Sequence, residues 1–247
     1  MPITGLPEIV AGDDLGALLT ARLAEAEPGL QSGDILVVTQ KIVSKAEGRS
    51  VDLADMVPSP EAKALASEVN KDPALVELVL RESSAVVRKA PNILITRHRL
   101  GHVMANAGID ASNIGSGNGG KVLLLPLDPD ASAARFADAA EAHFGFRPGV
   151  VISDSFGRPW RVGTVNVAIG VAAMPSIIDQ RGQADRDGRI MQMTMIAVGD
   201  AVAAAAGVAM GEGDEGIPAV IVRGLRLAGE HQTSRAIVRP VDEDLFR

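Results

Sequence analysis

The chain has 247 residues, of which 47% are hydrophobic, so it can build a substantial core in one large domain or two small ones. Because it contains no cysteine, disulfides, thiolate zinc sites and a thiol nucleophile are excluded. A formal net charge of -7 and 2% aromatic residues argue against a nucleic-acid ligand. The N-terminus lacks the basic flank and apolar stretch of a signal peptide, so we expect a cytoplasmic protein.

The first half of the chain alternates short apolar runs with a longer amphipathic segment. Residues 33–39 are typical of a turn followed by a buried strand. Residues 60–81 carry apolar side chains near helical spacing, and Pro73 is expected to divide this helix in two. Another strand is predicted at 92–96, and a polar loop at 105–113.

The next segment predicts a helix between two strands, at 122–125 and 150–153. Asp128 is expected to cap this helix and Gly145 to end it. The order strand, helix, strand indicates a crossover unit and a mixed α/β (α+β) fold. Asp154 then falls at the carboxyl end of a strand, where ligands bind in open α/β sheets.

Three apolar segments complete the prediction. The uncharged run 162–178 contains polar residues, glycine and proline, so we expect a buried strand and loop and no membrane span. The Ala-rich segment 195–210 predicts a helix that is buried in the core or in a dimer interface. Residues 219–222 form the last predicted strand.

A glycine-rich loop at 115–121 matches most of two phosphate-binding patterns. Both patterns require a strand before the loop and a helix after it, and the P-loop also requires a hydroxyl where Val122 stands. Because an apolar strand follows here, we interpret the glycines as a flexible connection.

Oxygen-bearing side chains on three predicted loops suit a hard divalent cation. They are Asp110 with Asn113, Asp154 with Ser155, and the acidic turn 212–216. Taken alone, each of them is more typical of a capped turn or a solvated loop than of a metal ligand.

Basic residues offer further candidates. Lys41 and Lys45 are four residues apart, so they either reach one phosphate group together or form a solvated basic face. His98 and His102 show the same spacing without a convincing helix, so a zinc site is not expected there. Arginines in polar loops either hold an anionic substrate or pair with nearby aspartates. The arginines are Arg158, Arg161, Arg181 and Arg189, and the aspartates are Asp179, Asp185 and Asp187.

Several phrases, read in order, resemble one family, the coenzyme F420-0:gamma-glutamyl ligases. The resemblance extends over nearly the whole chain, and several phrases have eight or more residues, which makes it more specific than any single cluster. The phrases are 5–9, 33–49, 106–113, 152–161, 181–182 and 216–224.

The resemblance implies a ligase that uses GTP and Mg²⁺ or Mn²⁺ to join L-glutamate to coenzyme F420-0 through an acyl phosphate, forming a gamma-linked tail. Potassium is a further cofactor to consider. The implied fold is a single ligase domain over 1–247, with two sub-domains possible, in an intertwined homodimer. Some members of the family carry a C-terminal flavin-binding domain, for which this sequence has no room, so their redox activity is not expected.

The resemblance also assigns residues. The implied metal ligands are Asp110, Asp154, Ser155 and Glu212; Glu212 departs from the family, where an amide is expected. The implied nucleotide contacts are Leu6, Pro7, Glu8, Ile9, Gln40, Lys41, Lys45, Asn113, Met210, Gly211, Glu212, Gly213, Asp214, Glu215, Gly216 and Ile217. No general base for the incoming amine is singled out. Two alternatives stay open: a ligase with the same nucleotide and metal site but another acid as acceptor, and a nucleotide-binding protein without turnover.

Overall fold

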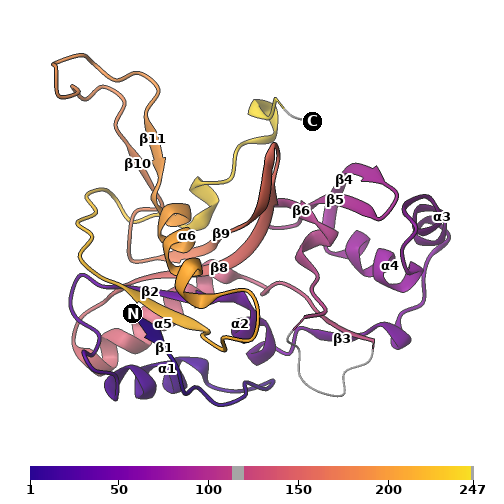
Figure 1. Cartoon of the computed structure of the whole chain (residues 1–247), viewed down its shortest axis with the longest axis horizontal. Coiled ribbons are helices and arrows are strands. Elements are labelled where there is room, and N and C mark those ends of the chain that lie inside the picture. Colours follow the sequence, from indigo (N-terminus) through magenta and orange to yellow (C-terminus); the bar gives the residue numbers. More distant parts are fainter. Residues whose placement is uncertain (113–119, 246–247) are drawn as a thin grey trace.

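A five-stranded sheet forms the centre of the larger part of the molecule (Figure 1). The computed structural model describes residues 1–112 and 120–245. The two central strands, β2 and β8, run parallel, and every other neighbouring pair is antiparallel. In spatial order the strands are β1 (Pro2–Ile3), β12 (Ala219–Val222), β2 (Ile35–Thr39), β8 (Gly149–Arg158) and β9 (Arg161–Ala172).

Helices cover both faces of this sheet. Helices α1 (Leu15–Ala24) and α5 (Pro129–Phe144) pack on one face, and α6 (Val198–Met210) packs on the other. Because side chains alternate along a strand, adjacent residues of β2 enter different cores: Val38 joins the cluster with α1 and α5, and Val37 joins the cluster with α6. The sheet is therefore buried on both sides.

A smaller unit has a hydrophobic cluster of its own, built from two helices and a three-stranded antiparallel sheet (Figure 1). In the sequence, the short helix α2 and strand β3 precede this unit, and strand β7, which pairs with β3, follows it. The elements are α2 (Gln40–Ala46), β3 (Ser50–Asp52), α3 (Pro60–Val69), α4 (Pro73–Arg81), β4 (Ser83–Ala90), β5 (Ile93–His98), β6 (Val103–Ala105) and β7 (Lys121–Leu123).

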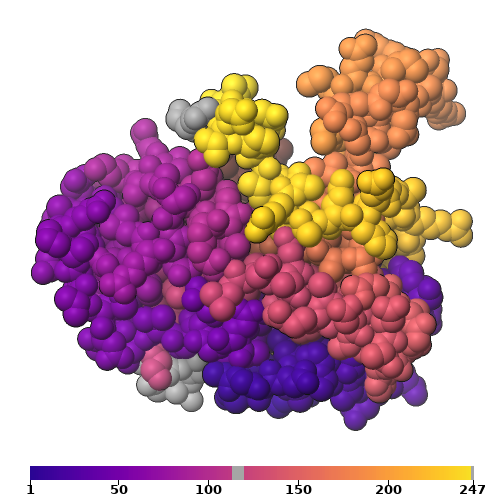
Figure 2. All heavy atoms as spheres, turned by 180° about the vertical axis from the view of Figure 1, so that it is seen from behind, coloured from indigo at the N-terminus to yellow at the C-terminus, as the bar shows by residue number. Residues whose placement is uncertain are grey.

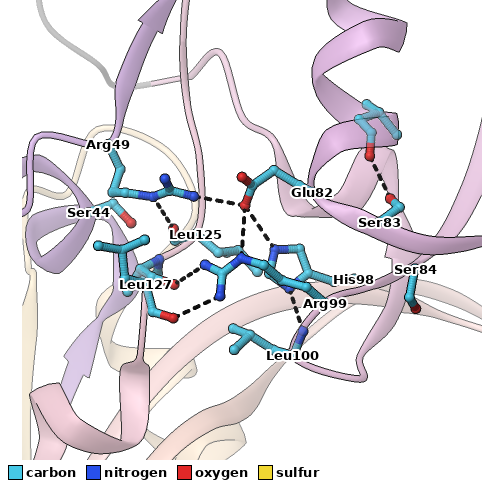
Figure 3. Close-up of polar contacts among 12 residues, drawn as sticks. Ser44, Arg49, Glu82, Ser83, Ser84, His98, Arg99, Leu100, Leu125 and Leu127 are labelled. Atoms are coloured by element: carbon cyan, nitrogen blue, oxygen red, sulfur yellow. Dashed lines mark hydrogen bonds and ion pairs between the residues drawn. The ribbon is translucent and has the colours of Figure 1, made fainter. Parts of the chain in front are cut away.

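A half-buried carboxylate connects the two units. Glu82, which follows α4, accepts hydrogen bonds from Arg49 at 2.8 Å and from Arg99 at 3.3 Å (Figure 3). Nε2 of the buried His98 lies 3.4 Å from the same carboxylate. Arg49 also donates to the backbone carbonyl of Leu125, on the segment that leads into α5. Arg49 and Arg99, from two different segments, therefore share one negative charge, and His98 lies against it.

Two hairpins extend from the large sheet. The arm, residues 177–197, contains β10 (Ile177–Asp179) and β11 (Met195–Ala197) and projects clear of the body (Figures 1 and 2). The hairpin of β8 and β9 turns at its tip, where Trp160 is exposed and adopts a φ of 59°.

The C-terminal segment is attached to α5 through one side chain. The carboxylate of Asp130 accepts hydrogen bonds from the backbone N–H groups of Val171 and Ser234, both at 2.8 Å. Short 3-10 helices lie at Leu53–Asp55, Asn106–Gly108, Ser234–Ala236 and Val241–Glu243. Within the described ranges, no helix combines the length and apolar character needed to cross a membrane.

Local signals in the sequence are confirmed at most element ends. The helix over 60–81 breaks before Pro73, where Asp72 accepts hydrogen bonds from Ala74 and Leu75. Asp128 caps α5, and Gly145 ends it with a φ of 76°. The mixed α/β fold class is confirmed as well, as are the strands at 35–39 and 219–222.

The predicted crossover unit is wrong, because β7 belongs to another sheet and β8 pairs in parallel with β2. The predicted helix at 195–210 begins only at Val198, since residues 195–197 form a strand of the arm. The run 162–178 is buried only in its later part; Val162 is fully exposed, because β9 extends past the sheet with β8 as its sole partner among the described strands.

Candidate active site

Strand direction brings four chain segments to one edge of the sheet. β2 and β8 are parallel, so both of their carboxyl ends lie at this edge. β12 is antiparallel to β2 and therefore begins here, and β1, antiparallel to β12, ends here. The loop after β1, helix α2 after β2, the loop before β12 and the outer half of β8 consequently meet, as is general for binding sites in open α/β sheets.

A cavity of about 840 Å³ opens at this edge, within the size range of small-molecule sites. Its walls come from the loop after β1, the start of α2, the outer parts of β8 and β9, and the turn between α6 and β12. They are Leu6, Pro7, Glu8, Ile9, Thr39, Lys41, Ile42, Lys45, Ala111, Asp154, Ser155, Asn166, Met210, Gly211, Glu212, Gly213, Asp214, Glu215, Gly216, Ile217 and Pro218.

Asp154 lies where β8 continues beyond β2. Thr39, the last residue of β2, pairs with Ser153, so the next residues of β8 face the cavity. Burial, together with the negative charges of Asp110 and Glu212, raises the pKa of Asp154 to about 7, against the opposing effects of a hydrogen bond from the backbone N–H of Ser155 and the charge of Lys41. The site therefore gathers negative charge that a bound cation would neutralise.

The two lysines of α2 already hold acidic partners. Nζ of Lys41 lies 2.7 Å from Oδ2 of Asp110 and donates to Oγ of Ser112, also at 2.7 Å. Nζ of Lys45 lies 2.7 Å from the carboxylate of Glu8. Of the two alternatives for these lysines, a solvated basic face does not describe them, since both ammonium groups are ion-paired at the cavity.

The turn between α6 and β12 folds around one glutamate. Oε2 of Glu215 accepts a hydrogen bond from the backbone N–H of Gly213 at 2.9 Å. Gly211 adopts a φ of 73°, and a Cβ on it would lie 2.1 Å from Cδ of Glu215. A residue with a side chain at 211 would be strained and would displace this carboxylate.

Comparison with known proteins decides the family. A profile described as F420-0:Gamma-glutamyl ligase matches residues 4–224. The chain belongs to the F420-0:gamma-glutamyl ligase family. A relative from Methanothermobacter thermautotrophicus, named Coenzyme F420:L-glutamate ligase, is 43% identical over 250 residues, which cover 99% of this chain and 97% of the relative. A relative of the same name from Methanopyrus kandleri is 45% identical, and the match covers 96% of this chain and 92% of the relative. Another of that name, from Halobacterium salinarum, is 43% identical, and the match covers 99% of this chain and 94% of the relative.

The structure of this family member brings most of the predicted nucleotide residues to the cavity. Gln40 is an exception, because it is buried and its Oε1 accepts a hydrogen bond from Ser44 at 2.8 Å. Asn113 lies outside the described residues, as do 115–119 of the glycine-rich loop. After that loop the chain enters strand β7 at Lys121, so the helix required by the phosphate-binding patterns is absent from this place.

Of the predicted metal ligands in the ligase, Asp154, Ser155 and Glu212 line the cavity, while Asp110 reaches it only through its ion pair with Lys41. Carboxylate and hydroxyl oxygens are suitable donors for Mg²⁺ or Mn²⁺. Among the described residues, however, no three His, Asp or Glu side chains converge as a ready-made metal site. The donor chemistry fits a divalent cation, and the acidic side chains must turn to bind it.

Other sequence candidates lie away from the cavity of the ligase. His98 is buried against Glu82, and Arg181 pairs with Asp179 at 2.6 Å on the arm. Arg158 and Arg161 are exposed at the tip of the β8–β9 hairpin.

Sequence reasoning missed several residues of the cavity. Asn166 carried a signal, since it is the one amide in the otherwise apolar stretch 165–169. The other missed residues contribute backbone and apolar surface, which have no motif; they are Thr39, Ile42, Ala111 and Pro218.

Proposed function

We propose that this member of the family joins L-glutamate to coenzyme F420-0, with GTP and Mg²⁺ or Mn²⁺, through an acyl phosphate, and so builds a gamma-linked glutamyl tail. The observation that carries the proposal is the cavity at the strand ends, which gathers two lysines and three side chains with oxygen donors suited to a divalent cation. The names of the relatives and of the family agree with coenzyme F420 and glutamate as substrates.

The chemistry of amide formation requires what this cavity offers. A carboxylate is a poor electrophile, so one of its oxygens must become a leaving group. The acceptor carboxylate attacks the γ-phosphorus of GTP, the bond from phosphorus to the bridging oxygen breaks, and GDP leaves. The glutamate amine then attacks the acyl carbon, phosphate departs, and the amine loses a proton.

In this proposal the lysines of α2 neutralise the nucleotide phosphates. Lys41 and Lys45 exchange Asp110 and Glu8 for phosphate oxygens when GTP binds, because a triphosphate carries more negative charge than a single carboxylate. Release of Lys41 also frees the carboxylate of Asp110. The glycine-rich turn 211–217 supplies backbone contacts to the nucleotide.

The metal would be held by Asp154, Ser155 and Glu212, with Asp110 joining once it leaves Lys41. When bound, a divalent cation stabilises negative charge on the transferred phosphoryl group, an effect worth several kcal/mol. Potassium is the further candidate cofactor.

The deciding experiment is a mass-spectrometric assay of the purified protein with coenzyme F420-0, L-glutamate, GTP and MnCl₂ or MgCl₂. We expect products heavier by one or more glutamyl units, with one GDP formed per unit, and neither in the presence of EDTA. GTP binding that depends on metal but gives no glutamylated product would refute the proposal, and turnover with another acid would identify a different acceptor.

We propose further that the protein is a homodimer formed through the arm. Large apolar side chains of the arm are exposed, including Met193 at 88% and Ile190 at 52%, as expected of a contact surface. We expect light scattering to give a dimer for the wild type and a shift toward monomer for Met193→Lys with Ile190→Lys. Val57→Lys, which replaces a side chain 80% exposed outside the arm, is the matched control and should remain dimeric. A monomeric wild type would contradict the proposal.

A further inference from the structure

Asn166 is a half-buried polar residue of the cavity. It lies on β9 directly opposite Ser155 of β8, between Val165 and Val167. It lines the same cavity as Asp154. Within residues 1–112 and 120–245, its side-chain amide makes no hydrogen bond. A half-buried amide of this kind is available to a ligand.

Helix α6 leaves room for this amide through one glycine. A Cβ on Gly207 would lie 1.9 Å from Oδ1 of Asn166 and 2.4 Å from its Cγ, so an alanine there cannot coexist with the present position of Asn166. Gly207 has ordinary helical geometry, and glycine inside a helix costs about 1 kcal/mol relative to alanine. The helix is therefore less stable with this glycine than it would be with alanine, at the point where Asn166 packs against it.

The contact with Gly207 also orients the amide. Measured from a Cβ placed on Gly207, Oδ1 is the nearest atom of Asn166, whereas Nδ2 lies farther away than Cβ of Asn166, which is at 2.9 Å. The amide nitrogen, which carries two N–H donors, is thus the polar end turned away from α6. Its natural partner is an anionic oxygen, which accepts stronger hydrogen bonds than a neutral one.

The position of β9 separates Asn166 from the lysines. Lys41 and Lys45 lie on the helix that follows β2, whereas β9 is on the other side of β8. In an in-line phosphoryl transfer, the attacking group approaches phosphorus from the side opposite the leaving nucleotide. Asn166 therefore lies apart from the lysines that are proposed to hold the nucleotide phosphates, on the side of the cavity that this inference gives to the acceptor.

We propose that Asn166 donates a hydrogen bond to the acceptor carboxylate that becomes phosphorylated, and that Gly207 holds it in place. This inference rests on the proposed function. One carboxylate oxygen is bound by the amide while the other attacks the γ-phosphorus, and the electrons of the broken bond leave with the nucleoside diphosphate. A neutral amide orients the nucleophile without adding a positive charge that would weaken it.

The first test compares Asn166→Ala with Thr164→Ala, a matched control on the same face of β9, exposed and outside the cavity. We expect Asn166→Ala to lower kcat/KM for F420-0 about 10- to 100-fold, the effect of a hydrogen bond to a charged group, while KM for GTP changes less than about twofold. Thr164→Ala should match the wild type. A parallel rise in KM for GTP would assign Asn166 to the nucleotide and overturn the inference.

The second test uses the contact with α6. Gly207→Ala should lower kcat/KM for F420-0 as Asn166→Ala does, and the double variant should be little worse than either single variant, because both remove the same interaction. Additive losses would overturn the proposed role of Gly207. Equilibrium dialysis of F420-0 tests the contact without turnover. An equal Kd for the wild type and Asn166→Ala would overturn the inference. A wild type that binds F420-0 but does not turn it over would count against the proposed function alone.

Discussion

Replacement of Asp154 by asparagine is expected to reduce ligase activity by at least about a hundredfold, because in the proposed function Asp154 holds a cation whose stabilisation of the phosphoryl group is worth several kcal/mol. The substitution keeps the size of the side chain and removes its charge. Initial rates of glutamylated product at saturating GTP would measure the loss. The matched control, Glu61→Gln, changes an exposed carboxylate on α3 and should leave the rate unchanged. Wild-type activity in Asp154→Asn would exclude a metal-binding role.

The same substitution should stabilise the metal-free protein at alkaline pH. The pKa of Asp154 is raised from 3.8 to about 7, so the folded state binds a proton more tightly than the unfolded state does. The wild type therefore loses stability as pH rises from about 4 to 7, by about 2–4 kcal/mol. In urea unfolding with EDTA, Asp154→Asn should exceed the wild type at pH 8 and lose this advantage at pH 4. An equal difference at both pH values would contradict this explanation.

Glu82→Gln should cost about 3 kcal/mol of unfolding free energy at pH 7, because two arginines lose their shared counter-charge. Burial opposes ionisation of Glu82, but the hydrogen bond with His98 and the charges of Arg49 and Arg99 outweigh it and lower its pKa from 4.5 to about 2. This stabilisation is complete above pH 4.5 and is lost as pH falls toward 2.

Urea unfolding of wild type and Glu82→Gln between pH 7 and pH 2 would measure this effect. The difference between the two proteins should stay constant at neutral pH and shrink below pH 4.5, while carboxylates common to both cancel. Glu68→Gln is the matched control, since its ion pair with Lys89 is half exposed, and it should cost less than about 1 kcal/mol. A difference that does not change with pH would mean that lost packing, not charge, explains the destabilisation.

Signals that act within a few residues were readable from the sequence alone. Pro73 ends one helix and begins the next, and Asp128 and Gly145 delimit α5, because caps and proline act on the adjacent backbone whatever the surrounding fold. The phrases that resemble the ligase family were equally readable. They pointed to the loop after β1 and the turn 211–217, which the structure brings to one cavity.

Strand pairing, by contrast, depends on residues far apart in the chain. The partner of β8 is β2, more than a hundred residues earlier, and no local pattern distinguishes it from β7. This pairing leaves Asp154 beyond the end of β2, and the packing of α6 on β9 presses Gly207 against Asn166. The sequence by itself determined helices α3 to α6, strands β2, β5, β7, β8 and β12, and the family, since these follow from short-range chemistry. Only the tertiary structure decided which side chains share the cavity, because long-range pairing and packing set those distances.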